Sequence, residues 1–556
     1  MTSGGELSIV IECACSSDQS SSRQHPSVCA VSLGLRTCIC LPSLASRGRF
    51  GLTLSRLNPM DRQEKIHSME RNMNSNLTVG WAQADITPDR PVLIAGQFHA
   101  RVSEGVADPI TATVCALATG EDHAVLVSCD LVAVADELRD EVRRRAGAQL
   151  PDLNSMKIIL SATHTHTAPE TRSPSPGSAH TSSGVGVELD VMPTPEYVDF
   201  AAERISEAVV QAWRSKASAG FAFGLGYAVV GRNRRWVDTD GRSTMYGKTN
   251  TPAFSHIEGY EDHSVNLLAT CGPAGEVTGL IVNVPSPSQV TESDFALSAD
   301  YWHETRQELR RRFGKGLPVL AQCSAAGDQS PHLIYDKKGE ARMLELRESS
   351  ERQEIARRIA DAVEAILPPA RKSLERTPRL RHVAQTVELP TTSVTEADVA
   401  AALGEAANYE KQYEEEIRKL KESPELREQS RWYVPATRAY RRMRWFQRVQ
   451  ERFESQKTHP TLPVEIHVIR LGDVVFATNP FEYYLDHGIH IKARSAAVQT
   501  FLVQLSGSGT YVPSARSVSG GGYGSVPASN RIGPEGGRAL AEQTIEIVEQ
   551  LFAEAS

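Results

Sequence analysis

The sequence lacks the features that mark several specialised classes of protein. It contains no run of about 18 apolar residues, so it predicts no transmembrane segment. Acidic residues outnumber basic ones, 68 to 60, and the net charge of -8 gives no general attraction to nucleic acid or anionic membranes. Only four of the nine cysteines lie beyond residue 40, so the body of the chain is not a disulfide scaffold. What remains is the composition of an ordinary globular protein, with 40% hydrophobic residues.

The first 74 residues differ from the rest. They are rich in Ser, Arg and Cys and show no sustained periodicity, so we expect residues 1–74 to form a disordered N-terminal extension that need not belong to the native protein. Their two Cys-x-Cys pairs lack the two-residue spacing of zinc knuckles. Arg36 and Pro42 interrupt their apolar stretch, which makes it a poor signal peptide. The default location is therefore cytoplasmic, with secretion or the periplasm as alternatives.

Beyond residue 77 the chain alternates strand and helix patterns. Residues 124–128 and 157–160 are short apolar runs typical of buried strands, and residues 136–148 between them carry apolar side chains on one helical stripe. This order predicts a β-α-β unit and an α/β fold, with a mixed β-sheet core and flanking helices. Further helices are expected at 195–217, 301–313, 351–366 and 538–555, and further strands at 279–284, 318–322, 465–471, 474–478 and 501–505.

One long charged segment departs from this alternation. Thr395 and Asp398 have the spacing of a capping box, and apolar residues follow at seven-residue intervals until Pro424 interrupts them. A second helical stretch follows, so we expect an inserted helical hairpin. The predicted organisation is the extension at 1–74, an α/β domain formed by 75–392 and 460–556, and the hairpin at 393–459.

Two histidines, His164 and His166, follow the strand predicted at 157–160. In an extended chain residues i and i+2 point the same way, so the two imidazoles would share one face. They could bind one ion together, or one could bind a metal while the other contacts a substrate. The plain alternative is a pair of solvent-facing residues at the end of a strand.

Three other predicted strands also end in polar groups. Asp328 and Ser330 follow the strand at 318–322, Glu482 follows that at 474–478, and Tyr511 follows that at 501–505. Each residue alone could serve only to form a turn, but α/β proteins bind ligands at strand ends. The four strand ends together indicate a site.

In this order the motifs resemble the neutral ceramidase family, zinc-dependent amidases that cleave the N-acyl bond of ceramide. The motifs are VGWAQADITP (79–88), SATHTH (161–166), GRNR (231–234), SAD (298–300), GDQSP (327–331), PFE (480–482) and YVPS (511–514). The resemblance covers most of the chain after residue 77, apart from the helical insertion.

The resemblance implies roles for seven residues. The zinc ligands would be His164, Glu482 and Tyr511. His166 would contact the substrate, Ser330 would be the active-site serine, and Arg234 and Tyr523 would stabilise the reacting acyl group. Zinc with an open coordination position lowers the pKa of bound water to near 7, so that hydroxide can attack an acyl carbonyl. Ser330 would either position that carbonyl or act as a nucleophile.

The sequence departs from the family pattern at two places. Ser286 stands where the family supplies a second histidine ligand, and the replacement candidates are His263, Gln289, Glu292 and His303. The chain also ends soon after the helix expected at 538–555, without the family's C-terminal immunoglobulin-like domain.

The preferred function is therefore a zinc-dependent hydrolase of an N-acyl amide, acting on a small acylated molecule, with a lipid such as ceramide among the candidates. The alternative is a non-catalytic relative that binds a lipid or another acylated ligand. A third reading is phosphoester hydrolysis through Ser330 beside Asp328. No nucleic-acid partner is expected.

Overall fold

The computed structural model describes residues 76–172 and 184–553. The extension predicted at 1–74, with its cysteine pairs, lies outside these residues. Among the described helices none is long and apolar enough to span a membrane. The described cysteines, Cys115, Cys129, Cys271 and Cys323, are buried and unpaired.

The first sheet has the strand order β4-β3-β2-β1-β5. Its strands are β1 (Thr78–Asp85), β2 (Thr111–Ala118), β3 (His123–Cys129), β4 (Ile158–Ala162) and β5 (Ala217–Ser218). β3 and β4 are parallel and joined through α2 (Asp136–Gln149), which confirms the predicted β-α-β unit. α2 and α3 (Thr194–Arg214) pack their apolar residues against this sheet.

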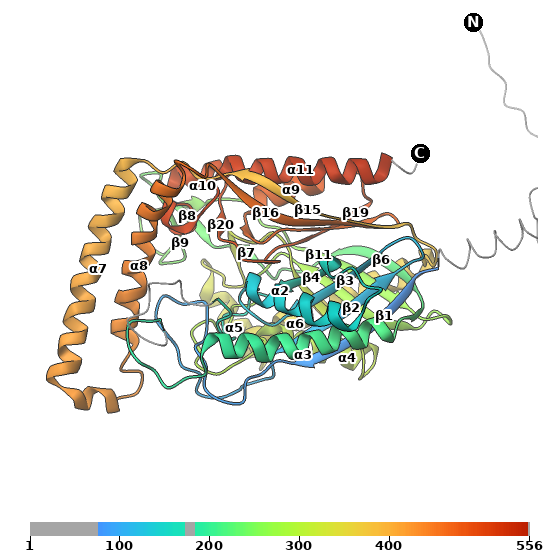
Figure 1. Ribbon diagram of the computed structural model, residues 1–556, viewed down its shortest axis with the longest axis horizontal. Coiled ribbons are helices and arrows are strands. Elements are labelled where there is room, and N and C mark those ends of the chain that lie inside the picture. The colour runs from blue at the N-terminus through green and yellow to red at the C-terminus, as the bar shows by residue number, and fades with distance from the viewer. Residues whose placement is uncertain (1–75, 173–183, 554–556) are drawn as a thin grey trace, which may run out of the picture. The chain divides into compact units, whose positions relative to one another are not determined.

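The second and third sheets have the orders β13-β12-β11-β6 and β15-β16-β17-β19. The second consists of β6 (Gly220–Tyr227), β11 (Ser264–Cys271), β12 (Val277–Val284) and β13 (Val319–Cys323). The third consists of β15 (Leu380–Pro390), β16 (Thr461–Leu471), β17 (Val474–Thr478) and β19 (Gln499–Val503). α4 (Tyr301–Phe313) and α6 (Glu351–Ala370) cover the second sheet. α9 (Leu485–Arg494) and α11 (Pro534–Ala553) cover the third, as Figure 1 shows for α11.

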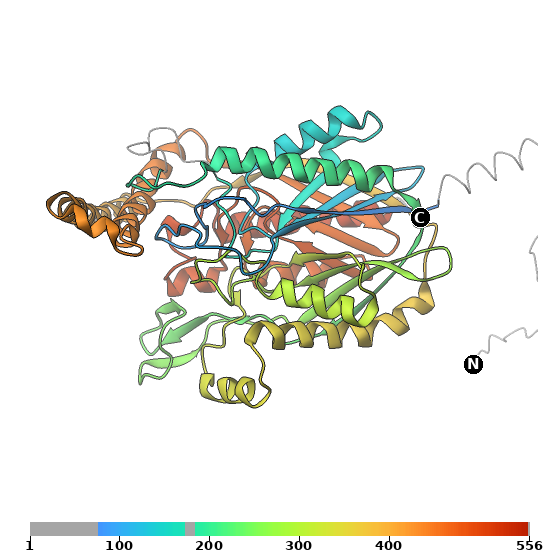
Figure 2. The same cartoon turned by 90° about the horizontal axis from the view of Figure 1, so that it is seen from below.

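The three sheets share one apolar core. Leu126 of the first sheet, Ile281 of the second and Phe476 of the third belong to the same buried cluster. The helices therefore lie outside the sheets, with α3 and α6 on opposite sides (Figure 2). This arrangement confirms the predicted α/β class with a mixed sheet core and flanking helices.

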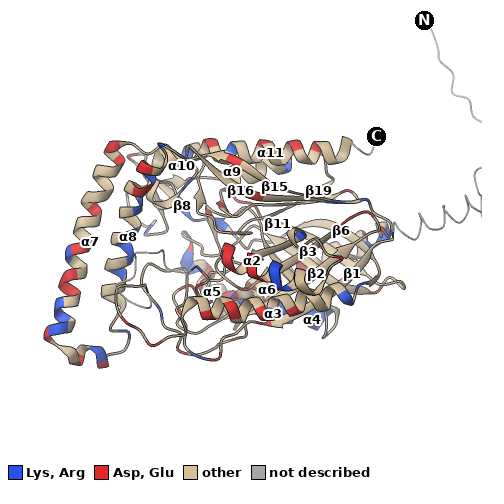
Figure 3. Cartoon of the chain, in the orientation of Figure 1, with Lys and Arg blue, Asp and Glu red and all other residues tan. Residues whose placement is uncertain are grey.

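The inserted helical hairpin consists of α7 (Glu396–Glu422), the short η4 (Pro424–Glu428) and α8 (Val434–Ser455). Thr395 and Asp398 form the predicted capping box at its start. Charged residues line most of α7 (Figure 3), whereas its buried residues include Ala406 and Leu420 of the predicted seven-residue repeat. The hairpin enters between β15 and β16, where Pro390 is directly opposite Thr461.

Short elements complete the fold and carry most of the candidate site. They are η2 (Ser155–Lys157), β7 (Arg232–Asn233), β8 (Arg235–Asp238), β9 (Ser243–Met245), β10 (Phe254–Ile257), β14 (Gln329–Ser330), α5 (Lys337–Leu346), η3 (Arg371–Ser373), β18 (Glu482–Tyr483), β20 (Tyr511–Val512), α10 (Ala515–Gly520) and η5 (Pro527–Ser529). β14 pairs with β7, and β18 pairs with β20.

Candidate functional site

The His164 side chain is positioned by an unusual backbone conformation. His164 lies just beyond β4 with φ of 64°, so the chain is not extended there. The prediction that an extended chain places both histidines on one face is therefore wrong. The rings nevertheless meet, with Nε2 of His164 3.3 Å from Nε2 of His166. Nδ1 of His164 donates to the backbone oxygen of Val132 at 2.6 Å. In that tautomer Nε2 is the acceptor facing the site.

Glu482 and Tyr511 are brought together by two short strands. β18 and β20 are parallel, with Glu482 directly opposite Tyr511. Oε2 of Glu482 lies 3.4 Å from Nε2 of His164, and the Tyr511 hydroxyl donates a hydrogen bond to the Glu482 carboxylate. The three residues expected to bind metal therefore converge, although long stretches of sequence separate them.

Arg234, between β7 and β8, is held from several directions. One terminal nitrogen, Nη2, donates to the backbone oxygen of Gly327 at 2.8 Å and to the Tyr511 hydroxyl at 3.3 Å. The other, Nη1, donates to the Tyr246 hydroxyl at 3.0 Å and to Oε1 of Gln289 at 3.3 Å. These four hydrogen bonds fix the planar guanidinium, so Arg234 is oriented before any ligand binds.

The segment that lacks the family's second histidine closes one side of this group. Ser286 is fully buried, and Gln289 and Glu292 follow it, joined by a hydrogen bond of 3.1 Å. Oε2 of Glu292 also lies 3.6 Å from Nδ1 of His166. The other candidates, His263 and His303, instead lie 3.2 and 3.8 Å from carboxylates elsewhere in the chain. Of the four replacement candidates, Gln289 and Glu292 therefore contact residues of the site.

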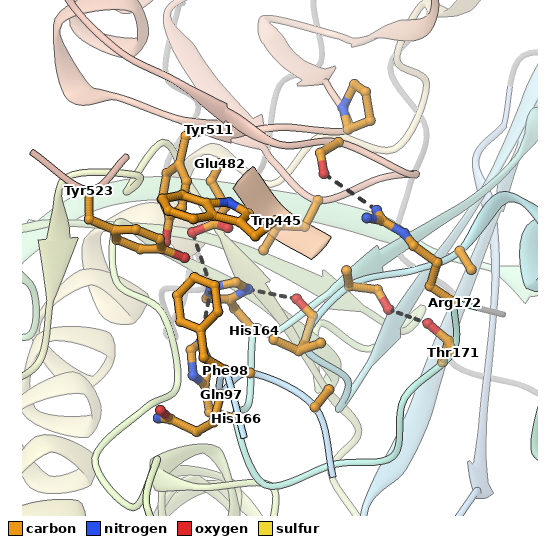
Figure 4. A pocket seen from close by; sticks show the side chains of 18 of the residues that line it. Gln97, Phe98, His164, His166, Thr171, Arg172, Trp445, Glu482, Tyr511 and Tyr523 are labelled. Carbon is orange, nitrogen blue, oxygen red and sulfur yellow. Dashed lines mark hydrogen bonds and ion pairs between the residues drawn. The ribbon is translucent and has the colours of Figure 1, made fainter. Parts of the chain in front are cut away.

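These groups border a cavity of about 370 Å³ (Figure 4). The predicted residues His164, His166, Glu482, Tyr511 and Tyr523 all line it. Phe98 and Trp445 add apolar surface. Their ring centroids lie 5.3 Å apart, and the rings meet edge to face. The cavity thus combines a few polar groups with an aromatic wall, as is common in small-molecule sites.

Ser330 and Arg234 are buried and are not among the described residues that line this cavity. The Ser330 hydroxyl accepts a hydrogen bond from the backbone N–H two residues on, at 3.0 Å, and contacts the Tyr246 hydroxyl. Asp328 accepts from the backbone N–H of Leu485 at 2.9 Å, at the start of α9. The loop 327–330 therefore contacts the site indirectly: Gly327 binds Arg234, and Ser330 binds Tyr246.

Burial and neighbouring charges set the protonation states in the site. Burial, the adjacent His164 and Arg101 hold the pKa of His166 well below its usual value, so this ring is neutral near pH 7. Burial acts to raise the pKa of Glu482, but His164 and Arg234 outweigh it, and the carboxyl is ionised. Burial and the charge of Glu482 raise the pKa of Tyr511 well above its usual value, which keeps the phenol protonated.

The donor atoms of the site match the needs of a zinc ion in kind and spacing. In the described part of the chain no three side chains of the His, Cys, Asp and Glu types gather as metal ligands, so a site here needs the Tyr511 oxygen. Nε2 of His164 and Oε2 of Glu482, 3.4 Å apart, have the separation of two ligand atoms on one zinc. His164, Glu482 and Tyr511 thus fit a three-ligand zinc site, with Arg234 close to the same carboxylate at 3.6 Å.

Sequence patterns did not reveal several residues that shape the site. Arg101 is fully buried and donates to backbone oxygens of His166 at 2.5 Å and Asp294 at 2.7 Å, which ties two site loops together. Gly96 has φ of 95°, and a Cβ there would lie 2.6 Å from the His166 ring. Trp445 comes from the inserted hairpin. Only their three-dimensional neighbours distinguish these residues from ordinary loop and helix residues.

Comparison with known proteins supports the fold. No family model matches the chain, and no curated protein matches its sequence. Among solved structures, it is similar to the neutral ceramidase from Pseudomonas aeruginosa, with 15% identity and a TM-score of 0.59, over 86% of this chain and 74% of that one. A ceramidase complexed with C2 is similar at 16% identity and a TM-score of 0.60, over 86% and 76% of the two chains. The chain therefore has the fold of the neutral ceramidases, as the motifs predicted.

Proposed function

We propose that this protein hydrolyses an N-acyl amide bond in a small acylated molecule. The observation that supports this most is the convergence of His164, Glu482, Tyr511 and Arg234 beside one cavity, on a ceramidase fold. Ceramide is one candidate substrate, since both similar structures are ceramidases.

We further propose that the site binds zinc through His164, Glu482 and Tyr511. When bound, zinc supplies the Lewis acidity that makes water nucleophilic near neutral pH. Three protein ligands are typical of catalytic zinc sites, so Ser286 in place of a histidine is compatible with activity.

The chain's own residues have three tasks in this reaction. Arg234 points its fixed guanidinium toward the Tyr511 hydroxyl, where it would stabilise negative charge on the acyl oxygen. His166, neutral and 3.3 Å from His164, would exchange a hydrogen bond with the amide. Phe98 and Trp445 would bind the apolar part of the acyl chain and exclude water from the scissile bond.

The test joins metal content to turnover. We expect purified protein to hold one zinc per chain, and a chelator to remove both the zinc and the hydrolysis of an N-acyl amide. His164→Ala should lower zinc content in the same way. His263→Ala is the matched control, because that ring contacts Glu261 rather than the site.

Three results would contradict the proposal in different ways. Turnover that survives complete removal of metal would leave the hydrolase but reject zinc. Binding of acylated ligands with no turnover, in protein loaded with zinc, would favour the non-catalytic alternative. Turnover of a phosphate monoester and of no amide would favour phosphoester hydrolysis.

A further inference from the structure

Two arginines line the cavity in addition to the residues already assigned. Arg172 follows the histidine segment, and Arg448 comes from α8 of the inserted hairpin. In Figure 4, Arg172 and Tyr523 lie on opposite sides of the cavity, with His164 between them. The cavity therefore has a cationic end that is separate from its aromatic end.

These two arginines have no carboxylate partner among residues 76–172 and 184–553. Arg172 only reaches the backbone oxygen of Gly509, at 3.5 Å. By contrast, Arg441 and Arg444 on the same helix pair with Glu170 and Glu451, at 2.5 and 3.4 Å. Residues 173–183, which follow Arg172, contain no Asp or Glu in their sequence. Glu451 acts on Arg448 only at longer range, without an ion pair, so both arginines can still pair with an anionic ligand.

The two cations border the same cavity, so one ligand can contact both. Burial, followed by the charges of Arg172 and Arg444, lowers the pKa of Arg448. Burial and Arg172 also lower the pKa of the nearby Arg531. Like charges that face a cleft attract anions to it and are relieved when an anion binds.

The aromatic end fits a different part of a substrate. The ring centroid of Tyr523 lies 5.8 Å from that of Phe98 and 5.9 Å from that of Trp445, so the three rings form one continuous apolar surface. An acyl chain packed there would place its carbonyl beside His164 and Glu482. The amine half of the amide would then extend toward Arg172 and Arg448. A volume of about 370 Å³ is near the lower end for ligand cavities, which suits one chain and a small amine better than two long chains.

We propose that the substrate is an N-acyl amide whose amine half carries a negative charge, a carboxylate above all, bound by Arg172 and Arg448. This proposal rests on the amide hydrolysis proposed above. It distinguishes an N-acyl amino acid from a neutral amide such as an N-acyl amino alcohol.

The test compares matched amides of one fatty acid. N-dodecanoylglycine and N-dodecanoylethanolamine have amine halves of similar length but differ in charge, and N-dodecanoyltaurine replaces the carboxylate by a sulfonate. We expect kcat/KM to be at least about tenfold higher for the glycine amide than for the ethanolamine amide. Turnover of the taurine amide comparable to that of the glycine amide would show that the arginines recognise negative charge and not specifically a carboxylate.

Variants assign the preference to the two arginines. Arg172→Gln and Arg448→Gln should each lower kcat/KM for the glycine amide by about tenfold and leave the ethanolamine amide within about twofold. Arg427→Gln is the matched control in the same hairpin, since its guanidinium lies over the Trp432 ring, 5.1 Å from the ring centroid, and should leave the preference unchanged. An equal preference for both amides in the unmodified protein, or equal losses for both in the variants, would overturn the proposal.

Binding separates a failure of this proposal from a failure of the hydrolase. Calorimetric titration of the three amides into unmodified protein and Arg448→Gln needs no turnover. Tighter binding of the anionic amides, lost in Arg448→Gln, would support the arginine site even if no amide is cleaved. Cleavage of the amides together with equal binding of all three would keep the hydrolase and reject the arginine site.

Discussion

At the scale of single residues, the site consists of side chains whose orientation is fixed by the backbone and by hydrogen bonds. His164 occupies a left-handed backbone conformation, which costs a non-glycine residue about 1 kcal/mol and is common at functional sites. Its Nδ1 is engaged by a backbone oxygen, and the guanidinium of Arg234 is held by Gly327, Tyr246 and Gln289. Such preorganisation is what stabilisation of a developing charge requires.

Arg234→Lys should therefore reduce kcat much more than it changes KM. Lysine keeps the charge but cannot form the four planar contacts, so we expect kcat to fall by about 100-fold, the typical effect of losing one donor to an oxyanion. Steady-state kinetics on the preferred amide would measure this. Arg232→Lys is the control, because Arg232 contacts Glu340 and the backbone of Pro331 instead. Similar losses in both variants would remove Arg234 from the reaction centre.

Ser330 gives a prediction about its two possible roles. It is fully buried and contacts Tyr246, so we expect it to position the site rather than form an acyl-enzyme. Ser330→Ala should lower kcat by at least about tenfold, equal to about 1.4 kcal/mol, with a nearly unchanged melting temperature. Rapid quenching and mass spectrometry of the unmodified enzyme should find no acyl group on Ser330. An acylated Ser330 would instead make it the nucleophile.

At the scale of secondary-structure elements, the strand ends deliver the site and ion pairs join the layers that hold it. Arg143 of α2 makes a two-pronged contact with Glu465 of β16, at 3.0 and 2.8 Å, and also donates to the backbone of Ile158 in β4. The first and third sheets are therefore connected by a charged contact next to the strand that leads to His164.

Breaking this contact should destabilise the fold in a pH-dependent way. Burial acts to raise the pKa of Glu465, but His467 and Arg143 outweigh it and hold that pKa below its usual value of 4.5. A lowered pKa means that the unfolded chain binds the proton more readily, so the stabilisation is complete above pH 4.5 and is lost as the pH falls below it. Glu465→Gln should flatten the stability profile in that acidic range.

A double-mutant cycle isolates the pair itself. Arg143→Met alone leaves the Glu465 carboxylate with His467 as its remaining partner and should cost about 2 kcal/mol of unfolding free energy. Arg143→Met combined with Glu465→Gln should cost clearly less than the sum of the single variants, as measured by urea unfolding at pH 7. Strict additivity would show that the two side chains do not interact.

At the scale of the whole molecule, the sequence predicted those parts whose patterns are local. The bounds of α4 and β17 agree with the predicted 301–313 and 474–478, because each is a continuous periodic run. β6 was missed, since glycines weaken a strand pattern. A Cβ at Gly224 would lie 2.5 Å from Ile366, so this glycine serves the packing of α6 and not the strand. The motifs predicted that His164, Glu482 and Tyr511 meet, whereas Trp445 and Arg448 reach the cavity only through the placement of a separate hairpin.

That hairpin provides the last prediction. It leaves the third sheet between β15 and β16, whose ends are already paired at Pro390 and Thr461, so a two-residue Asn-Gly turn can replace residues 391–460 without altering the strand register. We expect the shortened chain to keep its sheets, because the core shared by the three sheets contains no hairpin residue.

The shortened chain should nevertheless lose most of its activity. Trp445 and Arg448 would be absent from the cavity, and Leu93 and Val185, which pack on the hairpin, would become exposed. Circular dichroism should show an intact β signal with a melting temperature lowered by several degrees, since exposing each such side chain costs about 1.5 to 3 kcal/mol. Turnover of the preferred amide should fall by more than tenfold, because the anionic and apolar halves of the substrate each lose a contact. Full activity in a folded, shortened chain would mean that the hairpin covers the cavity without taking part in substrate binding.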